Sequence, residues 1–180
     1  MTTRHSAAFY RLMGMIAVSR PVTRLHPHLY RLTGGRWLFG HNLGVLNVIL
    51  ITTGRRTGKR REIPLYAFED GPCLVVIGSN AGGDREPAWV GNLRANPSAH
   101  VLVGREEVAV HARETEGAER SRLWTLASRG YPGYDLYARR THRHIPVIAL
   151  EPVHEPAHEP VREPGAPGEP GAPGEPRPEG

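Results

Sequence analysis

Cysteine and lysine are nearly missing from this chain of 180 residues, and long apolar runs are missing altogether. Cys73 is the only cysteine, so no intramolecular disulfide can form, which fits a reducing cytoplasm. No apolar run is long enough to cross a bilayer, and Arg11 and Gly14 interrupt the first apolar stretch, which makes a poor signal peptide. We therefore expect a cytoplasmic protein with one sizeable folded domain.

Familiar catalytic signatures are missing too. The chain has no GxGxxG before a helix, no Walker loop and no GxSxG elbow. The pairs His26/His28 and His142/His144 each lack a third ligand nearby, whereas a catalytic zinc site needs three. We therefore expect no metal site.

Charge is present in quantity but unevenly distributed. Residues 151–180 hold seven glutamates and two arginines, a local charge of −5 within a chain of net charge +5, so residues 1–150 carry +10. Such a field favours anionic partners, whether nucleic acid, lipid head groups or a charged cofactor.

Composition divides the chain into three parts. We expect an N-terminal helical segment over residues 1–40, a folded domain over residues 41–151 and a disordered acidic tail rich in proline and glycine over residues 152–180. A helix is predicted over residues 6–33, broken into pieces by its prolines.

The apolar face of this predicted helix is flanked by Arg4, Arg11 and Arg20. That arrangement suits a lipid interface as well as it suits packing on the folded domain. A peripheral membrane contact therefore stays open beside the cytoplasmic location.

The folded domain reads as mainly β. Apolar and alternating patterns predict six strands, over residues 45–53, 62–68, 73–79, 99–104, 107–114 and 145–150. Helices are predicted after Pro87, after Thr115 as the N-cap, and over the short tyrosine segment. Most loops are too short for parallel crossovers, so we expect a small, mainly antiparallel barrel with peripheral helices.

A strongly basic loop separates the first two predicted strands. The stretch ITTGRRTGKRREIPL (51–65) contains five basic residues, Arg55, Arg56, Lys59, Arg60 and Arg61. Two glycines allow tight turns that would leave loop amides free, and arginine forks suit phosphate and carboxylate oxygens. The loop is therefore a candidate anion site, although an ordinary solvated turn explains it as well when it is considered alone.

Two further clusters follow. In GSNAGGDREPAWVGNLRANP (78–97), a polar loop leads into a helix on which Trp89 is a packing candidate and Asn92 could point toward a ligand at the helix N-terminus. In YPGYDLY (131–137), Tyr131, Tyr134 and Tyr137 share one face. This face is either a polar aromatic wall or a plain amphipathic surface.

Together these motifs resemble the deazaflavin-dependent nitroreductases, the Ddn-type reductases that use coenzyme F420. The resemblance rests on TTGRRTGKRREIPL, GSNAGG...PAW..NLRANP and YPGY..Y......IPV..LEP in this order, and covers about residues 40–152. It implies a split β-barrel that transfers a hydride from reduced F420 to a quinone, enone or nitroaromatic acceptor. F420 carries a phosphate and a γ-glutamyl tail, so the basic loop would bind that tail.

The resemblance also implies functional positions. The cofactor contacts would fall on Arg55, Arg56, Thr57, Arg61, Glu62, Ile63, Pro64, Leu65, Tyr66, Ile77, Gly78, Ser79, Asn80, Ala88, Trp89, Val90, Gly91, Asn92 and Tyr134. The acceptor pocket and catalytic groups would fall on Tyr66, Ser79, Tyr131, Tyr134 and Tyr137. Two departures from the family pattern stand out: Asn80 replaces a lysine seen in some members, and Val90-Gly91 replaces bulkier residues, which would widen the pocket.

Three alternatives stay open at this stage. An FMN-binding split barrel would use the same arginine-rich loop for its phosphate, and a non-catalytic F420-binding protein would share every motif. A nucleic-acid-binding barrel would expose aromatics between basic residues on its strands. Here the strands are mainly aliphatic, so nucleic acid is not an expected partner.

Overall fold

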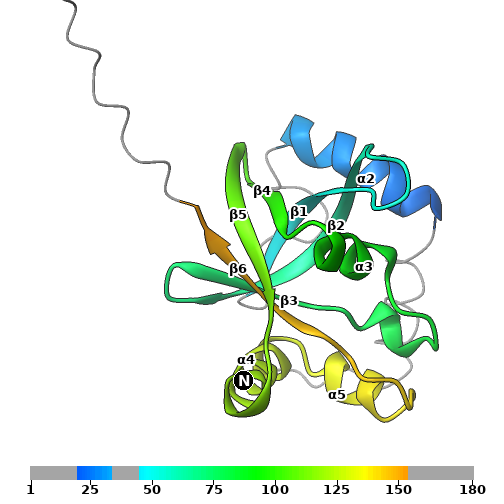
Figure 1. Cartoon of the computed structure of the whole chain (residues 1–180), viewed down its shortest axis with the longest axis vertical. Coiled ribbons are helices and arrows are strands. Elements are labelled where there is room, and N and C mark those ends of the chain that lie inside the picture. The colour runs from blue at the N-terminus through cyan, green and yellow to red at the C-terminus, as the bar shows by residue number, and fades with distance from the viewer. Residues whose placement is uncertain (1–19, 34–44, 154–180) are drawn as a thin grey trace, which may run out of the picture.

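Six antiparallel strands close into a barrel in the computed structural model, which describes residues 20–33 and 45–153 (Figure 1). The strands are β1 (Leu46–Thr53), β2 (Arg60–Asp70), β3 (Cys73–Ile77), β4 (Ser98–Val103), β5 (Glu106–Glu114) and β6 (Val147–Pro152). Their order around the barrel is β1-β2-β3-β6-β5-β4, and β4 pairs with β1 to complete it. The predicted fold class is confirmed.

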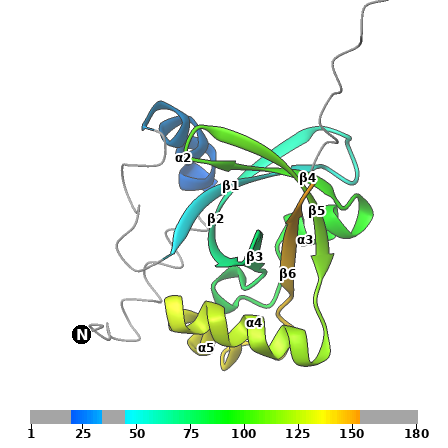
Figure 2. The ribbon, with the colours of Figure 1, turned by 90° about the vertical axis from the view of Figure 1, so that its left-hand side faces the viewer.

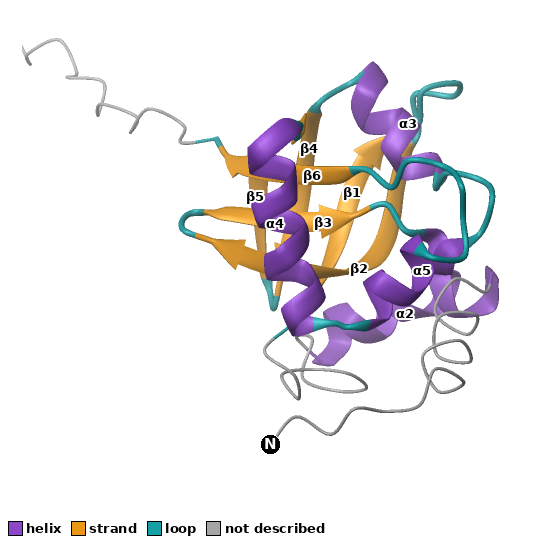
Figure 3. Cartoon of the chain, turned by 90° about the horizontal axis from the view of Figure 1, so that it is seen from below, coloured by secondary structure: helices purple, strands orange, loops and turns teal. Residues whose placement is uncertain are grey.

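Helices cover the barrel on several sides. They are α2 (Arg20–Thr33), the 3-10 turn η1 (Asn80–Gly82), α3 (Ala88–Ala95), α4 (Gly117–Gly130) and α5 (Gly133–Ala138). Figures 1 and 2 show α2 on one side of the barrel and α4 with α5 on the opposite side. Seen from below, α4 runs across the strands (Figure 3). No helix in the described ranges is long and apolar enough to span a bilayer.

The core occupies the barrel interior, and β1 is apolar on both faces. Val48 and Leu50 pack inside the barrel, while Ile49 and Ile51 face outward against Tyr30 of α2. This double burial explains why the strand reads as a continuous apolar run, because both of its faces are covered. Helix α3 adds Trp89, Val90 and Leu93 to the interior cluster.

Helix α2 runs through Pro27 without a break, so the predicted interruption there is wrong. Proline removes one helical hydrogen bond, but tertiary contacts of α2 offset that loss. The Tyr30 hydroxyl donates to Asn47 O at 2.7 Å and accepts from Gly104 N at 2.9 Å. Arg31 adds two bonds to the Glu62 carboxylate, at 2.7 and 2.6 Å.

The predicted cap at Thr115 is also wrong. Glu116 is the N-cap of α4, and the buried Thr115 hydroxyl donates instead to Val147 O at 3.1 Å. Residues 1–19, 34–44 and 154–180 lie outside the described residues. The first part of the predicted N-terminal helix and nearly all of the predicted tail fall in these ranges. The division of the chain at residues 40 and 151 therefore stays a prediction.

Candidate functional site

The three sequence clusters form one continuous chain of contacts. The basic loop reaches α3 through a bond from Arg55 N to Asn92 Oδ1 at 3.2 Å. Gly78 packs against Val90 of α3, and Gly82 packs against the backbone of Tyr137 in α5. The centres of the Tyr131 and Tyr66 rings lie 5.3 Å apart, and Tyr66 is on β2, the strand that follows the basic loop directly.

Most amides of the basic loop donate hydrogen bonds within the protein, contrary to the expectation that they stay free. Gly54 N donates to Lys59 O at 2.8 Å, and the amides of Thr57 and Gly58 donate to Gly54 O at 3.0 and 2.8 Å. The φ of +64° at Gly58 permits this tight turn. Any anion held here is therefore held chiefly by side chains.

The basic side chains of the loop fall into two groups. Arg60 is committed to carboxylates, with bonds to Glu107 at 2.8 and 3.1 Å and to Glu62 at 3.1 Å. Bonds from Arg31 and Arg60 also hold the pKa of Glu62 below its usual range. By contrast, Arg56, Lys59 and Arg61 are exposed and form no ion pair with any described residue.

Arg55 has a defined position over α3. Its Nη1 donates to Ala88 O at 3.2 Å, and its guanidinium lies so close to Gly91 that a methyl group at Gly91 would overlap it. Gly91 therefore makes room for Arg55. Val90 is wholly buried in the barrel core. The space beside Gly91 is thus occupied by Arg55, and a wider pocket at this pair stays a prediction.

Asn92 anchors the start of this loop. Only 6% of the residue is exposed, and its Nδ2 donates to the buried Thr52 hydroxyl at 3.1 Å while its Oδ1 accepts from Arg55 N. The nitrogen of the Asn92 amide thus has a partner on β1, and its oxygen has a partner in the basic loop. Sequence reasoning placed Asn92 at the helix N-terminus facing a ligand, whereas the structure gives it a role in holding the loop.

The loop after β3 presents Ser79 and Asn80 beside the tyrosine segment. The Ser79 hydroxyl makes no hydrogen bond within the described part of the chain, although the residue is only 8% exposed. Asn80 Nδ2 donates to Arg85 O at 2.9 Å, which ties the loop to the segment before α3. The Ser79 hydroxyl is thus a free polar group at this point of the site.

The three tyrosines form a buried aromatic cluster with Tyr66, Phe68 and Trp124. The Tyr131 and Tyr137 hydroxyls are bonded to each other at 3.0 Å. Burial raises the pKa of Tyr134 and of Tyr131, so both phenols are neutral at ordinary pH. No hydrogen bond to the Tyr134 hydroxyl is formed within the described residues, which leaves it able to donate to a ligand.

Several other predicted positions contribute through packing. Ile63 and Leu65 pack against the barrel interior, as does Trp89, while Ile77 belongs to the tyrosine cluster. Pro64 lies opposite Ile49 in the β1–β2 register. These apolar residues form the packed scaffold around the polar side chains of the candidate site.

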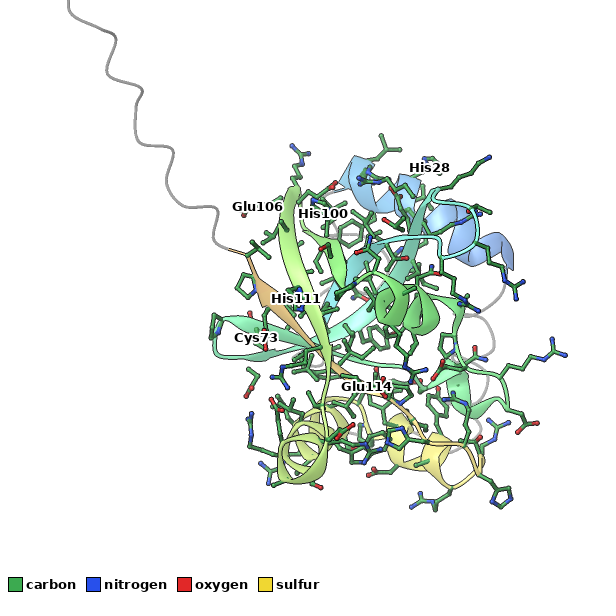
Figure 4. The ribbon with its side chains drawn as sticks, viewed as in Figure 1. His28, Cys73, His100, Glu106, His111 and Glu114 are labelled. Atoms are coloured by element: carbon green, nitrogen blue, oxygen red, sulfur yellow. The ribbon has the colours of Figure 1, made fainter. Side chains whose placement is uncertain are left out.

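The histidines, cysteine and carboxylates outside this region form no further candidate metal site among the described residues. His28 on α2 and five residues of the barrel strands, Cys73, His100, Glu106, His111 and Glu114, are dispersed (Figure 4). No group of three metal-binding side chains occurs among the described residues. Sequence reasoning missed one residue of the site, Arg143, whose guanidinium bonds the loop after β3. Nothing in its local sequence signals that contact.

Comparison with known proteins supports one family. The model of the F420H(2)-dependent quinone reductase family matches residues 22–152. An F420H(2)-dependent quinone reductase of Mycobacterium tuberculosis is 34% identical over 132 residues, which cover 71% of this chain and 87% of that protein.

Two solved structures resemble this chain in sequence and in fold. That of F420-H2 dependent reductase FDR-A is 37% identical, covers 63% of this chain and 100% of its own, and has a TM-score of 0.56. A domain-swapped dimer is 32% identical, covers 71% of this chain and 95% of its own, and has a TM-score of 0.58. The region that matches the family model contains the whole barrel and all three clusters.

Proposed function

Since the chain belongs to the F420H(2)-dependent quinone reductase family, we propose that this F420-dependent reductase passes the hydride of reduced F420 to a quinone. The observation that carries this proposal is that one chain of contacts joins a cationic loop to a buried aromatic cluster. One end of the contact chain carries cations that have no carboxylate partner in residues 20–33 and 45–153. At the other end lies a buried aromatic cluster whose Tyr134 hydroxyl has no hydrogen bond within the same ranges.

The cationic end fits the cofactor's anionic tail. Arg56 and Lys59 in the loop and Arg61 at the start of β2 are exposed and lack carboxylate partners among the described residues, so their charge is available. Guanidinium groups bind phosphate and carboxylate oxygens with paired hydrogen bonds. Arg55, fixed over Gly91, would orient the same tail at the end of α3.

The aromatic end fits a flat acceptor. When bound, reduced F420 supplies the hydride. The Tyr134 phenol would donate a hydrogen bond to the quinone oxygen on which negative charge grows. The Ser79 hydroxyl, which has no hydrogen-bond partner among the described residues, would be a second donor. The quinone gains the hydride and one proton from solvent to become the hydroquinone. Because the pKa of Tyr134 is raised, its hydroxyl acts as a neutral donor.

The exposed leucines of α2 support a peripheral membrane contact as part of this proposal. Leu32 is 75% exposed and Leu29 is 38% exposed on a helix that also carries Arg31. Because Arg31 is paired with Glu62, the contact would rest on the leucines, and an exposed apolar strip suits the boundary of a lipid bilayer. Co-sedimentation with anionic vesicles should fall in a Leu29→Ser/Leu32→Ser variant, and unchanged sedimentation would refute the contact.

Titration with F420 and with FMN tests the cofactor, and oxidation of F420H2 by a quinone tests the reaction. We expect tight binding of F420, weak binding of FMN and quinone-dependent oxidation. Preference for FMN would overturn the proposal. Binding of F420 without turnover on quinone, enone or nitroaromatic acceptors would indicate a carrier instead.

An Arg55→Ala/Arg56→Ala/Arg61→Ala variant tests the role of the loop. F420 affinity should fall by about a hundredfold, since charged hydrogen bonds contribute roughly 1.5–3 kcal/mol each and exposed ones less. Affinity of the wild type should also weaken as salt rises. Arg122→Ala is the matched control, because Arg122 pairs with Asp70 outside the contact chain. Equal affinity of the triple variant and this control would show that the loop is only a turn.

A further inference from the structure

The segment between β3 and α3 has an uncommon backbone. Asn80, Ala81 and Gly82 lie consecutively in the left-handed region, with φ of 46°, 51° and 76°. Left-handed φ costs a residue with a side chain roughly 1–2 kcal/mol, and two of these three have one. Such a turn persists only where its surroundings determine it, and strained turns of this kind concentrate at functional sites.

Arg143 bonds both ends of this segment. Its Nη2 donates to Gly78 O at 3.0 Å and to Ser79 O at 2.6 Å, and its Nε donates to Gly83 O at 2.9 Å. The remaining Nη1 donates to His144 O at 3.2 Å. All three nitrogens of one planar fork thus bind carbonyls, a geometry that the single ammonium of lysine cannot reproduce.

The same segment is pressed against the tyrosine helix. A methyl group on Gly82 would lie 3.0 Å from the Cα and the carbonyl oxygen of Tyr137. Gly78 N also donates to Pro146 O at 2.9 Å, next to the segment that carries Arg143. Any relaxation of the turn would therefore move Ser79 relative to the phenols.

We propose that Arg143 is a positioning residue of this enzyme, which clamps residues 78–83 in their left-handed turn and so fixes Ser79 and Asn80 against the tyrosine cluster. Its importance for F420 and quinone rests on the proposed function, whereas its hold on the turn does not. Arg143 makes no bond to a carboxylate in the described structure, and three of its four hydrogen bonds go to carbonyls of residues 78–83.

Arg143→Lys and Arg143→Met test the clamp, with Arg139→Met as the matched control. Arg139 is exposed at the end of α5 and has no side-chain bond among the described residues. Amide hydrogen exchange in the ligand-free protein should accelerate about tenfold or more at residues 79–83 in both Arg143 variants, since two or three charged hydrogen bonds are lost. The control and the barrel strands should keep wild-type exchange.

With ligands present, both Arg143 variants should bind F420 more weakly and show a lower kcat for quinone, with KM changed less. Wild-type exchange in Arg143→Lys would overturn the clamp, because charge alone would then suffice. Faster exchange spread over the whole barrel would also overturn it. Faster exchange at the turn with unchanged F420 affinity and turnover would refute the positioning role. A wild type that does not bind F420 would refute the proposed function but leave the exchange result standing.

Discussion

Replacing Asn92 by alanine tests how the basic loop is held. The change removes the acceptor of Arg55 N and the donor to the Thr52 hydroxyl. Each lost hydrogen bond costs about 0.5–1.5 kcal/mol, and leaving the Thr52 hydroxyl, in a residue only 3% exposed, without its donor adds about 1 kcal/mol or more. We therefore expect the free energy of unfolding to fall by about 2–4 kcal/mol.

A loss of that size lowers the melting temperature by roughly 10 °C in a domain of this length. F420 affinity should fall as well, because the Arg55 backbone is released. Urea unfolding followed by circular dichroism measures the first effect, and F420 titration at a temperature where the variant is folded measures the second. An unchanged melting temperature would refute the reasoning.

A double-mutant cycle with Thr52→Val identifies the bond responsible. In the wild-type background this change should cost about 1–2 kcal/mol, because it leaves a buried amide donor unpaired. In the Asn92→Ala background it should cost little, since the hydroxyl has already lost its partner. Equal costs in both backgrounds would show that the two side chains do not interact.

Three further predictions concern the rest of the site. Tyr134→Phe should lower kcat for quinone reduction by about tenfold to a hundredfold while F420 affinity stays unchanged. Tyr131→Phe should instead lower the stability of the protein, because the Tyr131 hydroxyl is hydrogen-bonded to that of Tyr137; equal turnover in both variants would show that the Tyr134 hydroxyl takes no part in the mechanism. Gly91→Ala should weaken F420 binding in calorimetric titration, because the new methyl displaces the Arg55 guanidinium; unaltered affinity would contradict this. Since burial raises the pKa of Tyr131 and Tyr134, their contribution to stability should be constant below about pH 10 and be lost as pH rises further, where the unfolded phenols release protons first. Urea midpoints that stay flat from about pH 9 to about pH 11 would be the contrary result.

Local chemistry was sufficient to predict the barrel and to single out the three clusters as candidates for the site. Strand positions follow from runs such as that around Ile49, because alternating and doubly apolar patterns reflect which faces are buried. The family motifs likewise lie in short contiguous stretches, so the basic loop and the tyrosine segment were visible before any contact was known. What was expected of individual site residues stays a prediction, tested by the variants above.

Tertiary structure alone decided which of these groups are free and which are used. Arg56 and Arg60 are equivalent in sequence, yet only Arg60 meets carboxylates, one of them 47 positions away on β5. Arg143 meets Gly78 across 65 positions. Barrel closure brings such partners together, and no local pattern encodes a pairing between residues so distant in the chain. Pro27 stays helical for the same reason, because contacts made by α2 with the barrel outweigh a local preference to break.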